Sequence, residues 1–291
     1  MRSHLVAILL AFCAVAAAQQ PPRVEPEIVR LPLVIEGKTT EVVAHIYKPA
    51  GAGPFPLVIH SHGRAGTAVD RAKLEYPVPV GHGNYWLRKG VAVVAPVRPG
   101  YGATGGADVE NSGVRWREAE CYTDPDFTSV AVHARRTVVA TYHWALQQPW
   151  VRKDRILVQG QSVGGLTTVG VAALNLPGVV GTVNFAGGSG GYPEVSPGKS
   201  CKPERLTLTY REFGRLAKAP SLWLYAQNDN YWGPDMPKAW HQAYAEGGSD
   251  TRAVFTGPVP EHDGHQLLLH GGRMWSMPLD EFVKKVGLTA R

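Results

Sequence analysis

Short, almost wholly apolar runs recur along this chain and constrain its fold more than any other feature of the sequence. Continuous apolar runs of this length suit strands buried on both faces of a parallel sheet. Segments of helical period lie between them, so the alternation of strand and helix predicts one doubly wound α/β domain. The runs are residues 57–59, 91–97, 156–158, 179–185, 222–226 and 253–256.

The segments between the runs carry apolar residues three or four positions apart, as expected of helices that cover a sheet. Before the first run, two β-rich stretches flank a turn that contains a glycine, which predicts an antiparallel hairpin. The fold class is therefore α/β, with a mostly parallel sheet and an amino-terminal antiparallel hairpin. The expected helices are 127–148, 163–174, 237–245 and 279–286, and the hairpin strands are 28–36 and 41–48.

The start of the chain has the features of a secretory signal peptide. After a positive start, residues 5–15 form an uncharged apolar run, and three alanines at 16–18 provide a cleavage site. The run is too short to span a bilayer, which takes about 20 residues. Lipoprotein processing is the other alternative, but a large residue precedes Cys13. We expect a signal peptide at 1–18, a catalytic domain at 19–291, and a secreted or periplasmic location.

Charge is spread evenly along the chain. The sequence has 30 Lys and Arg against 24 Asp and Glu, for a net charge of +6, which becomes +5 when Arg2 leaves with the signal peptide. Basic residues occur as isolated pairs, without the aromatic or basic motifs of a nucleic-acid module. We therefore expect no nucleic-acid partner. A modest attraction to anionic polymers or simple solubility would account for the charge.

Two cysteines, Cys121 and Cys201, remain after the expected cleavage. An even pair in an exported chain favours a disulfide, with two free buried thiols as the alternative. The cysteines lie in the two longest connections, 100–126 and 187–219, and each connection follows a predicted strand. Ligands bind beyond the carboxyl ends of parallel strands. We therefore expect both connections to border the binding site and the disulfide to join two of its walls.

A serine between glycines follows the strand predicted at 156–158, in the stretch LVQGQSVGGL. Gly160, Ser162 and Gly164 fit the pattern G-x-S-x-G, and a helix is expected directly afterwards. Such a strand-to-helix turn has a strained backbone and presents the serine above the sheet. A phosphate-binding loop is the alternative, but it would require a lysine that this stretch lacks. We interpret Ser162 as a nucleophile.

A serine hydroxyl is a weak nucleophile and needs a base, together with an acid that orients the base. Asp229 follows directly on a predicted strand and is the preferred acid, with Asp235 as the alternative. His265 is preferred as the base over His262, because a glycine just before it lets the chain bend and an apolar run follows it.

These motifs together resemble the α/β-hydrolase family, and within it the dienelactone-hydrolase-like and small serine esterase branches. The resemblance covers about residues 28–288 and rests on SHGRAG, RKGVAVVAPVRPGYG, GQSVGG, YAQND and DGH in the family's order. It implies an oxyanion hole formed by the backbone amides of Arg64 and Val163. True dienelactone hydrolases use a cysteine nucleophile, so Ser162 indicates ordinary ester hydrolysis instead.

Two further groups of side chains are candidates for binding. His60 and His62 alternate like two metal ligands, but they lack a third ligand, and we expect neither a metal nor a cofactor. Tyr231 and Trp232 follow the preferred acid and are expected to line the substrate pocket, with core packing as the alternative.

The sequence thus predicts a secreted serine hydrolase that cleaves small or polymer-borne carboxylic esters through an acyl-enzyme with a Ser-His-Asp triad. A prolyl-peptidase-like exopeptidase is one alternative, although such enzymes usually carry an extra amino-terminal domain. The other alternative is a binding module that kept the fold without the chemistry. No stable membrane insertion is expected after removal of the signal peptide.

Overall fold

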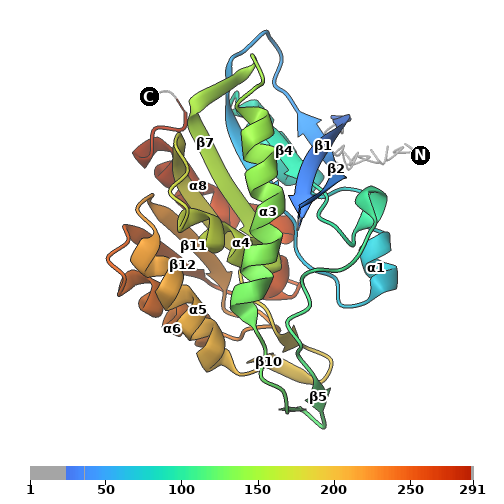
Figure 1. Cartoon of the computed structure of the whole chain (residues 1–291). Helices are drawn as coiled ribbons and strands as arrows, with labels where there is room; N and C mark the ends of the chain where they lie inside the picture. The colour runs from blue at the N-terminus through green and yellow to red at the C-terminus, as the bar shows by residue number, and fades with distance from the viewer. Residues whose placement is uncertain (1–23, 36, 290–291) are drawn as a thin grey trace, which may run out of the picture.

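An eight-stranded sheet with helices on both faces forms the centre of the computed structural model, which describes residues 24–35 and 37–289 (Figure 1). The strand order is β1-β2-β4-β3-β7-β8-β11-β12. β2 is antiparallel to both β1 and β4, and all neighbours from β4 to β12 are parallel. The predicted fold class is therefore confirmed. The strands are β1 (Glu27–Ile35), β2 (Lys38–Tyr47), β3 (Phe55–Ser61), β4 (Ala92–Pro96), β7 (Val151–Gln161), β8 (Val179–Phe185), β11 (Ser221–Ala226) and β12 (Thr251–Thr256).

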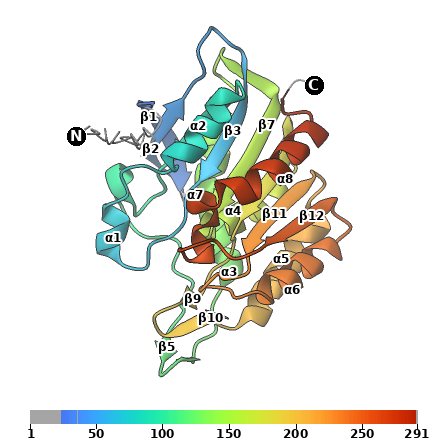
Figure 2. The same ribbon diagram turned by 180° about the vertical axis from the view of Figure 1, so that it is seen from behind.

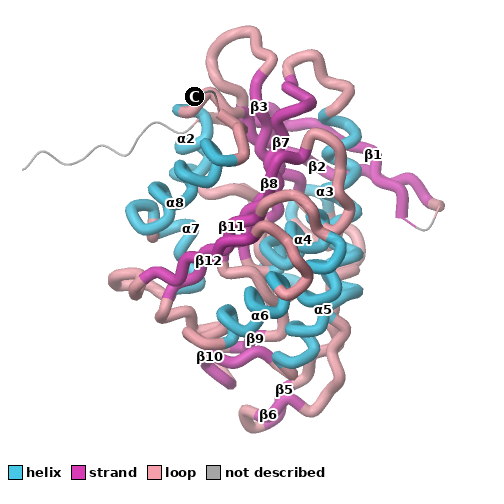
Figure 3. Tube along the Cα trace, turned by 90° about the vertical axis from the view of Figure 1, so that its left-hand side faces the viewer, coloured by secondary structure: helices cyan, strands magenta, loops and turns pink. Residues whose placement is uncertain are grey.

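The helices form two layers, one on each face of the sheet. Figure 1 shows α3, α4, α5 and α6 on one face, and Figure 2 shows α2, α7 and α8 on the other. The edge-on view in Figure 3 separates the layers. The helices are α1 (Ala68–Ala72), α2 (Val80–Arg88), α3 (Phe127–Ala145), α4 (Val163–Ala172), α5 (Pro203–Leu216), α6 (Met236–Ala245), α7 (Leu267–His270) and α8 (Gly272–Lys285). The short elements are η1 (Gly102–Thr104), η2 (Gly264–Gln266), β5 (Trp116–Arg117), β6 (Glu120–Cys121), β9 (Gly191–Tyr192) and β10 (Ser196–Ser200).

Alternate residues of the central strands pack into opposite layers, because successive side chains of a strand point to opposite faces. In β11, Leu222 and Leu224 pack in the same core cluster as Phe282 of α8, whereas Trp223 packs in the cluster of Tyr210 from α5. Trp223 is completely buried. Removing a tryptophan side chain from water contributes about 4 to 6 kcal/mol of transfer free energy. This two-sided burial explains why the strands are apolar throughout.

The connection predicted at 187–219 is not open throughout, because the 14-residue helix α5 occupies Pro203–Leu216. Proline stands in the first turn of this helix, where its missing N–H costs nothing. Leu206, Tyr210 and Phe213 recur three or four positions apart and are buried against the sheet. Many polar residues lie between them, and these obscure the helical period in the sequence.

A disulfide joins Cys121 and Cys201, with their Cα atoms 5.3 Å apart. Cys121 ends β6 in the connection between β4 and α3, and Cys201 lies just before α5. The predicted pairing is therefore present. The predicted signal peptide, residues 1–18, lies outside the described residues. Among the residues that are described, no helix is long and apolar enough to cross a membrane.

Candidate active site

Ser162 lies on a sharp turn between the end of β7 and the start of α4. Its backbone has φ 56° and ψ −125°, a conformation that a residue with a side chain rarely adopts. Two hydrogen bonds help to hold this conformation: the Ser162 N–H donates to the Phe185 carbonyl at 2.9 Å, and the Ser162 carbonyl accepts from the Gly188 N–H at 3.2 Å. The strain is therefore maintained by the neighbouring strand β8 and the residues that follow it.

The glycines around Ser162 are required by close approach of the backbone. A Cβ at Gly164 would overlap the carbonyl oxygen of Ser61 and lie 2.5 Å from that of His62. A Cβ at Gly160 would overlap the Gly164 carbonyl. The turn thus packs directly on the end of β3, and glycine is the residue that fits there.

Asp229 and His265 meet at the same end of the sheet. His265 Nδ1 lies 3.1 Å from Asp229 Oδ2, and the Asp229 side chain is completely buried. The other carboxylate oxygen, Oδ1, accepts the backbone N–H groups of Tyr231 at 2.8 Å and Trp232 at 3.1 Å. The carboxylate is therefore fixed by two amides, with one oxygen left to orient the imidazole.

The loop that carries His265 is braced from two sides. The Asp263 side chain accepts the His265 N–H at 2.9 Å. The Gln161 side chain donates to the His265 carbonyl at 2.9 Å, and Gln161 directly precedes Ser162 in the chain. Neither residue was predicted from the sequence to support the base. For Gln161, the signal was its position inside the G-x-S-x-G motif.

The alternative candidates for the acid and the base occupy other positions. Asp235 is exposed and pairs with Lys238 at 2.9 Å. His262 is exposed, and its ring stacks on that of His270 with centroids 3.6 Å apart. The structure thus pairs His265 with Asp229, and it assigns surface contacts to Asp235 and His262.

A cavity of about 600 Å³ opens beside Ser162 and His265, a volume within the usual range of ligand pockets. Tyr231 lines it and stacks on His265, with ring centroids 4.0 Å apart. Trp232 does not line it: the indole is 2% exposed and donates to the Ala186 carbonyl at 2.8 Å. The structure therefore places Trp232 in the core, the alternative to the expected position in the lining of the pocket. The remaining lining residues are His60, His62, Gly63, Arg64, Ala65, Leu74, Tyr76, Pro77, Val78, Pro79, Val80, Gln161 and Leu269.

The wall of this cavity comes from the connection between β3 and α2, not from the two long connections predicted to border it. Neither 100–126 nor 187–219 contributes a lining residue. Residues from the segment 74–80 line this side of the cavity instead. The connection 100–126 contacts a lining residue without lining the cavity itself, because its Asp108 forms an ion pair with Arg64.

The two residues predicted to supply oxyanion-hole amides flank Ser162. Val163 is the first residue of α4, so its N–H belongs to the turn that has no intrahelical acceptor. Arg64 belongs to the loop after β3 and lines the cavity. That loop passes close to the serine, because a Cβ at Gly63 would lie 3.4 Å from Ser162 Cβ.

His60 and His62 are both held by protein groups. The Gln159 amide lies 3.1 Å from His60 Nδ1, and His62 Nδ1 lies 2.7 Å from the Gly63 carbonyl. Burial lowers the pKa of both rings well below the usual range, and nearby charged groups lower it further. Within the part of the chain that the structure describes, no group of three His, Cys, Asp or Glu side chains has the arrangement of a metal site.

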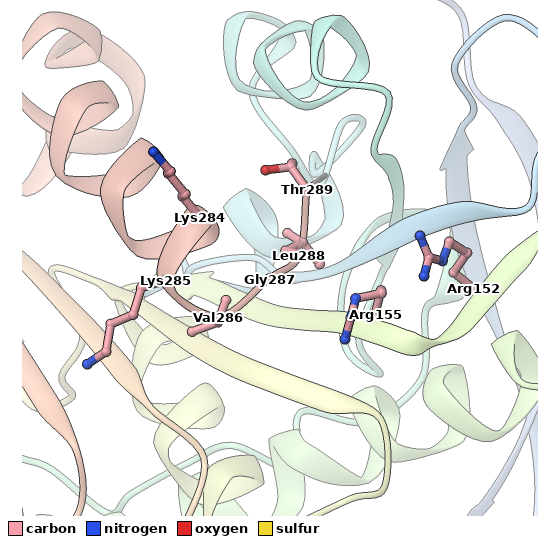
Figure 4. A pocket seen from close by; sticks show the side chains of 8 residues that line it. All are labelled: Arg152, Arg155, Lys284, Lys285, Val286, Gly287, Leu288 and Thr289. Atoms are coloured by element: carbon pink, nitrogen blue, oxygen red, sulfur yellow. The ribbon is translucent and has the colours of Figure 1, made fainter. Parts of the chain in front are cut away.

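A second cavity, of about 330 Å³, lies at the opposite end of β7. Figure 4 shows the side chains of Lys284 and Lys285 pointing away from each other. Lys285 pairs with Asp250 at 2.8 Å. Both lysines belong to the last turn of α8, where positive charge stabilises the helix dipole. The other two positive side chains, Arg152 and Arg155, come from β7 and pair with Asp154 at 3.5 and 3.9 Å. Its lining residues are Arg152, Arg155, Lys284, Lys285, Val286, Gly287, Leu288 and Thr289.

No family model and no curated protein matches this sequence. Many solved structures share its fold. Acylaminoacyl peptidase from Pyrococcus horikoshii aligns with a TM-score of 0.64 at 13% identity, over 93% of this chain and 43% of the peptidase. The esterase Pf2001 from Pyrococcus furiosus aligns with a TM-score of 0.58 at 15% identity, over 92% of this chain and 99% of the esterase.

Est1E from Butyrivibrio proteoclasticus gives a similar result, with a TM-score of 0.56 at 13% identity over 88% of this chain and 98% of Est1E. The chain thus spans less than half of the acylaminoacyl peptidase and nearly all of the two smaller proteins. Similarity at this level of identity establishes the architecture. The protein has the α/β-hydrolase fold, which esterases and peptidases share.

Proposed function

We propose that this protein is a serine hydrolase that cleaves carboxylic esters through a covalent acyl-enzyme. One observation carries the proposal: Ser162, on a strained turn, shares a cavity with His265, whose imidazole contacts the buried carboxylate of Asp229 at 3.1 Å. The α/β-hydrolase fold, shared with esterases and peptidases, supports the hydrolase class.

The proposed reaction begins when Ser162 Oγ adds to the ester carbonyl carbon and its proton passes to His265 Nε2. Asp229 keeps the other proton on Nδ1 and stabilises the imidazolium. The carbonyl oxygen, now negative, accepts hydrogen bonds from the amides of Arg64 and Val163. Each such donor contributes about 3 to 4 kcal/mol to stabilisation of the transition state.

Collapse of this intermediate breaks the bond between the acyl carbon and the alcohol oxygen. His265 gives its proton to the departing alkoxide, and the acyl group stays on Ser162. Water then adds to the acyl carbon and gives a proton to His265. The carboxylic acid leaves, and the proton returns to Ser162. The cycle needs no cofactor.

The cavity supports an ester of small to moderate size as the substrate. Its volume of about 600 Å³ accommodates an acyl group together with part of an alcohol. Residues 74–80 supply an apolar wall with two prolines. We further propose that the protein is exported. The disulfide between Cys121 and Cys201 and the signal-like residues 1–18 support an oxidising compartment.

An exopeptidase is the second candidate, because the fold is shared with acylaminoacyl peptidase. The chain spans 43% of the length of that protein. Ester cleavage is favoured because the chain aligns with nearly the full length of the esterase Pf2001.

The test is a rate panel on wild type, Ser162→Ala and the control Ser129→Ala, whose residue does not line the cavity. Substrates are p-nitrophenyl esters from acetyl to long acyl and one aminoacyl p-nitroanilide. We expect ester turnover that Ser162→Ala abolishes and Ser129→Ala preserves. Preference for the anilide would favour the exopeptidase. Turnover of no substrate, or turnover that survives Ser162→Ala, would overturn the proposal.

A further inference from the structure

We infer that Arg98 is a positioning residue that sets the direction of the Arg64 amide in the proposed oxyanion hole, an inference that rests on the proposed function. Arg98 follows β4, in the stretch RPGYG, and is completely buried behind the loop that leaves β3. It does not line the cavity, so its effect on the reaction passes through the loop.

One guanidinium group reaches successive residues of this loop. Arg98 Nη1 donates to the Ser61 hydroxyl at 2.9 Å and to the His62 carbonyl at 2.5 Å. Arg98 Nη2 donates to the Gly63 carbonyl at 3.3 Å. The planar, forked guanidinium makes these contacts together, which a single ammonium group cannot do.

The planarity of the peptide bond converts these contacts into an orientation. In a trans peptide the carbonyl of one residue and the N–H of the next point in opposite directions. The Gly63 carbonyl and the Arg64 N–H belong to one peptide. Because the carbonyl points toward Arg98, the N–H must point away from it. The loop passes beside Ser162, so the N–H is held ready for an oxyanion on that side.

His62 reinforces the same peptide. Its Nδ1 lies 2.7 Å from the Gly63 carbonyl, and its Nε2 accepts the Arg98 backbone N–H at 3.1 Å. This pattern requires a neutral ring with its hydrogen on Nδ1. Burial lowers the pKa of His62 well below its usual range, and the charge of Arg98 lowers it further, so the ring stays neutral. Arg98 thus acts through both its side chain and its backbone.

A buried carboxylate holds Arg98 in place. Glu110 Oε1 accepts from Arg98 Nε at 2.5 Å, and Glu110 Oε2 accepts from Arg98 Nη2 at 3.2 Å and from the Tyr101 hydroxyl at 3.1 Å. Both side chains of the ion pair are 0% exposed. Desolvation makes a buried pair a poor source of stability. The buried ion pair of Arg98 and Glu110 is therefore better explained by its role in fixing the loop after β3 than by a contribution to stability.

A second arginine holds the far side of the loop in the same way. Arg71 Nη1 donates to the carbonyls of Ala65 at 3.3 Å and Gly66 at 3.1 Å, and Arg71 pairs with Asp108 at 3.3 Å. Asp108 and Glu110, which anchor the two arginines, come from one short segment. The carbonyls of Gly63 and Ala65, on either side of Arg64, therefore both accept from arginines, which restricts the backbone of residue 64 from both directions.

The test compares Arg98→Lys with wild type, using a p-nitrophenyl ester and a trifluoromethyl ketone inhibitor. Lysine keeps a positive charge that can pair with Glu110, but it lacks the forked guanidinium group that contacts several residues of the loop together. Removing one oxyanion donor costs about 100-fold to 1,000-fold in kcat. For a donor that is only loosened we expect a loss of about 10-fold to 100-fold in kcat, with KM within about 3-fold. Affinity for the ketone, whose serine adduct is an oxyanion, should fall with kcat.

Two further variants separate positioning from general damage. The matched control is Arg135→Lys, since Arg135 donates to the Gly170 carbonyl at 3.0 Å without contacting the loop. It should keep kcat within about 2-fold. If thermal unfolding shows that Arg98→Lys does not fold, Arg71→Lys decides, with an expected loss of about 3-fold to 10-fold because it acts beyond the Arg64 peptide.

The inference is overturned if the folded arginine variants match Arg135→Lys in kcat and in ketone affinity while Ser162→Ala is inactive. A fall in melting temperature with unchanged kcat and ketone affinity would likewise overturn it, since it would reveal a purely structural role. If Ser162→Ala keeps full turnover, the proposed function itself fails, and the two failures remain distinguishable.

Discussion

Replacing two glycines of the same helix by alanine, which adds one methyl group each, should change the free energy of unfolding in opposite directions. Gly164 and Gly170 both belong to α4. A Cβ at Gly164 would overlap the Ser61 carbonyl oxygen and lie 2.5 Å from that of His62, well inside the contact distance of about 3.5 Å. At Gly170 the nearest atom is Ala131 Cβ at 3.4 Å, which an added methyl group can contact.

The two substitutions share the gain in helix propensity, about 1 kcal/mol for alanine over glycine. At Gly164 the clash is with main chain of β3 and of the loop after it, which cannot rotate away. Overpacking of this kind costs up to about 3 kcal/mol. We therefore expect Gly164→Ala to lower the free energy of unfolding by about 2 kcal/mol and Gly170→Ala to raise it by up to about 1 kcal/mol.

Urea unfolding followed by circular dichroism measures both changes, and ester turnover measures their effect on the site. Gly164→Ala should also lower kcat at least 10-fold, because the displaced residues lead directly into the proposed oxyanion loop. Gly170→Ala should keep wild-type kcat. Equal stability and equal activity of the two variants would refute the reasoning that close backbone approach requires glycine at 164.

Three other changes test separate parts of the structure. Asp229→Asn should lower kcat by about 10³-fold to 10⁴-fold in steady-state assays, because the amide no longer holds the base in the required tautomer; a loss below 10-fold would exclude this role. Replacing Cys121 and Cys201 by serine should lower the free energy of unfolding in urea by about 4 kcal/mol, since the bridge closes a loop with a sequence separation of 80; no change would contradict the entropic account. Burial lowers the pKa of His82 to about 4, so its contribution to stability is complete above about pH 6.5 and falls by about 3 kcal/mol as the pH drops to 4. In His82→Gln, the free energy of unfolding measured in urea should depend less on pH between about pH 6.5 and about pH 4. An unchanged pH dependence would count against this role of His82.

The sheet was predictable because burial on both faces leaves a direct mark on composition. The run 179–185 coincides with β8, and 222–226 falls within β11. The helix α5 was not predicted, because its polar residues are interspersed with the buried ones. Its packing depends on β11, a partner that lies later in the chain.

The arrangement of the candidate site was predictable where the chemistry depends on the ends of strands. Ser162 follows β7 directly, and Asp229 lies in the turn just after β11, so the topology brings both to one edge of the sheet. The wall formed by residues 74–80 and the burial of Trp232 depend on how loops pack, and local sequence carries no signal for that. Arg98 lies in RKGVAVVAPVRPGYG, one of the stretches that carry the family resemblance, but its contacts with the loop after β3 depend on the three-dimensional packing.

The link from Gln161 to the His265 carbonyl has a practical consequence for engineering. It ties the backbone of His265 to Gln161, the residue next to Ser162, so the two proposed reacting residues are held in one rigid unit. The opposite wall, residues 74–80, belongs to a different segment. If the proposed ester hydrolysis holds, libraries that vary residues 74–80 should change which esters are cleaved while leaving the alignment of Ser162 and His265 intact.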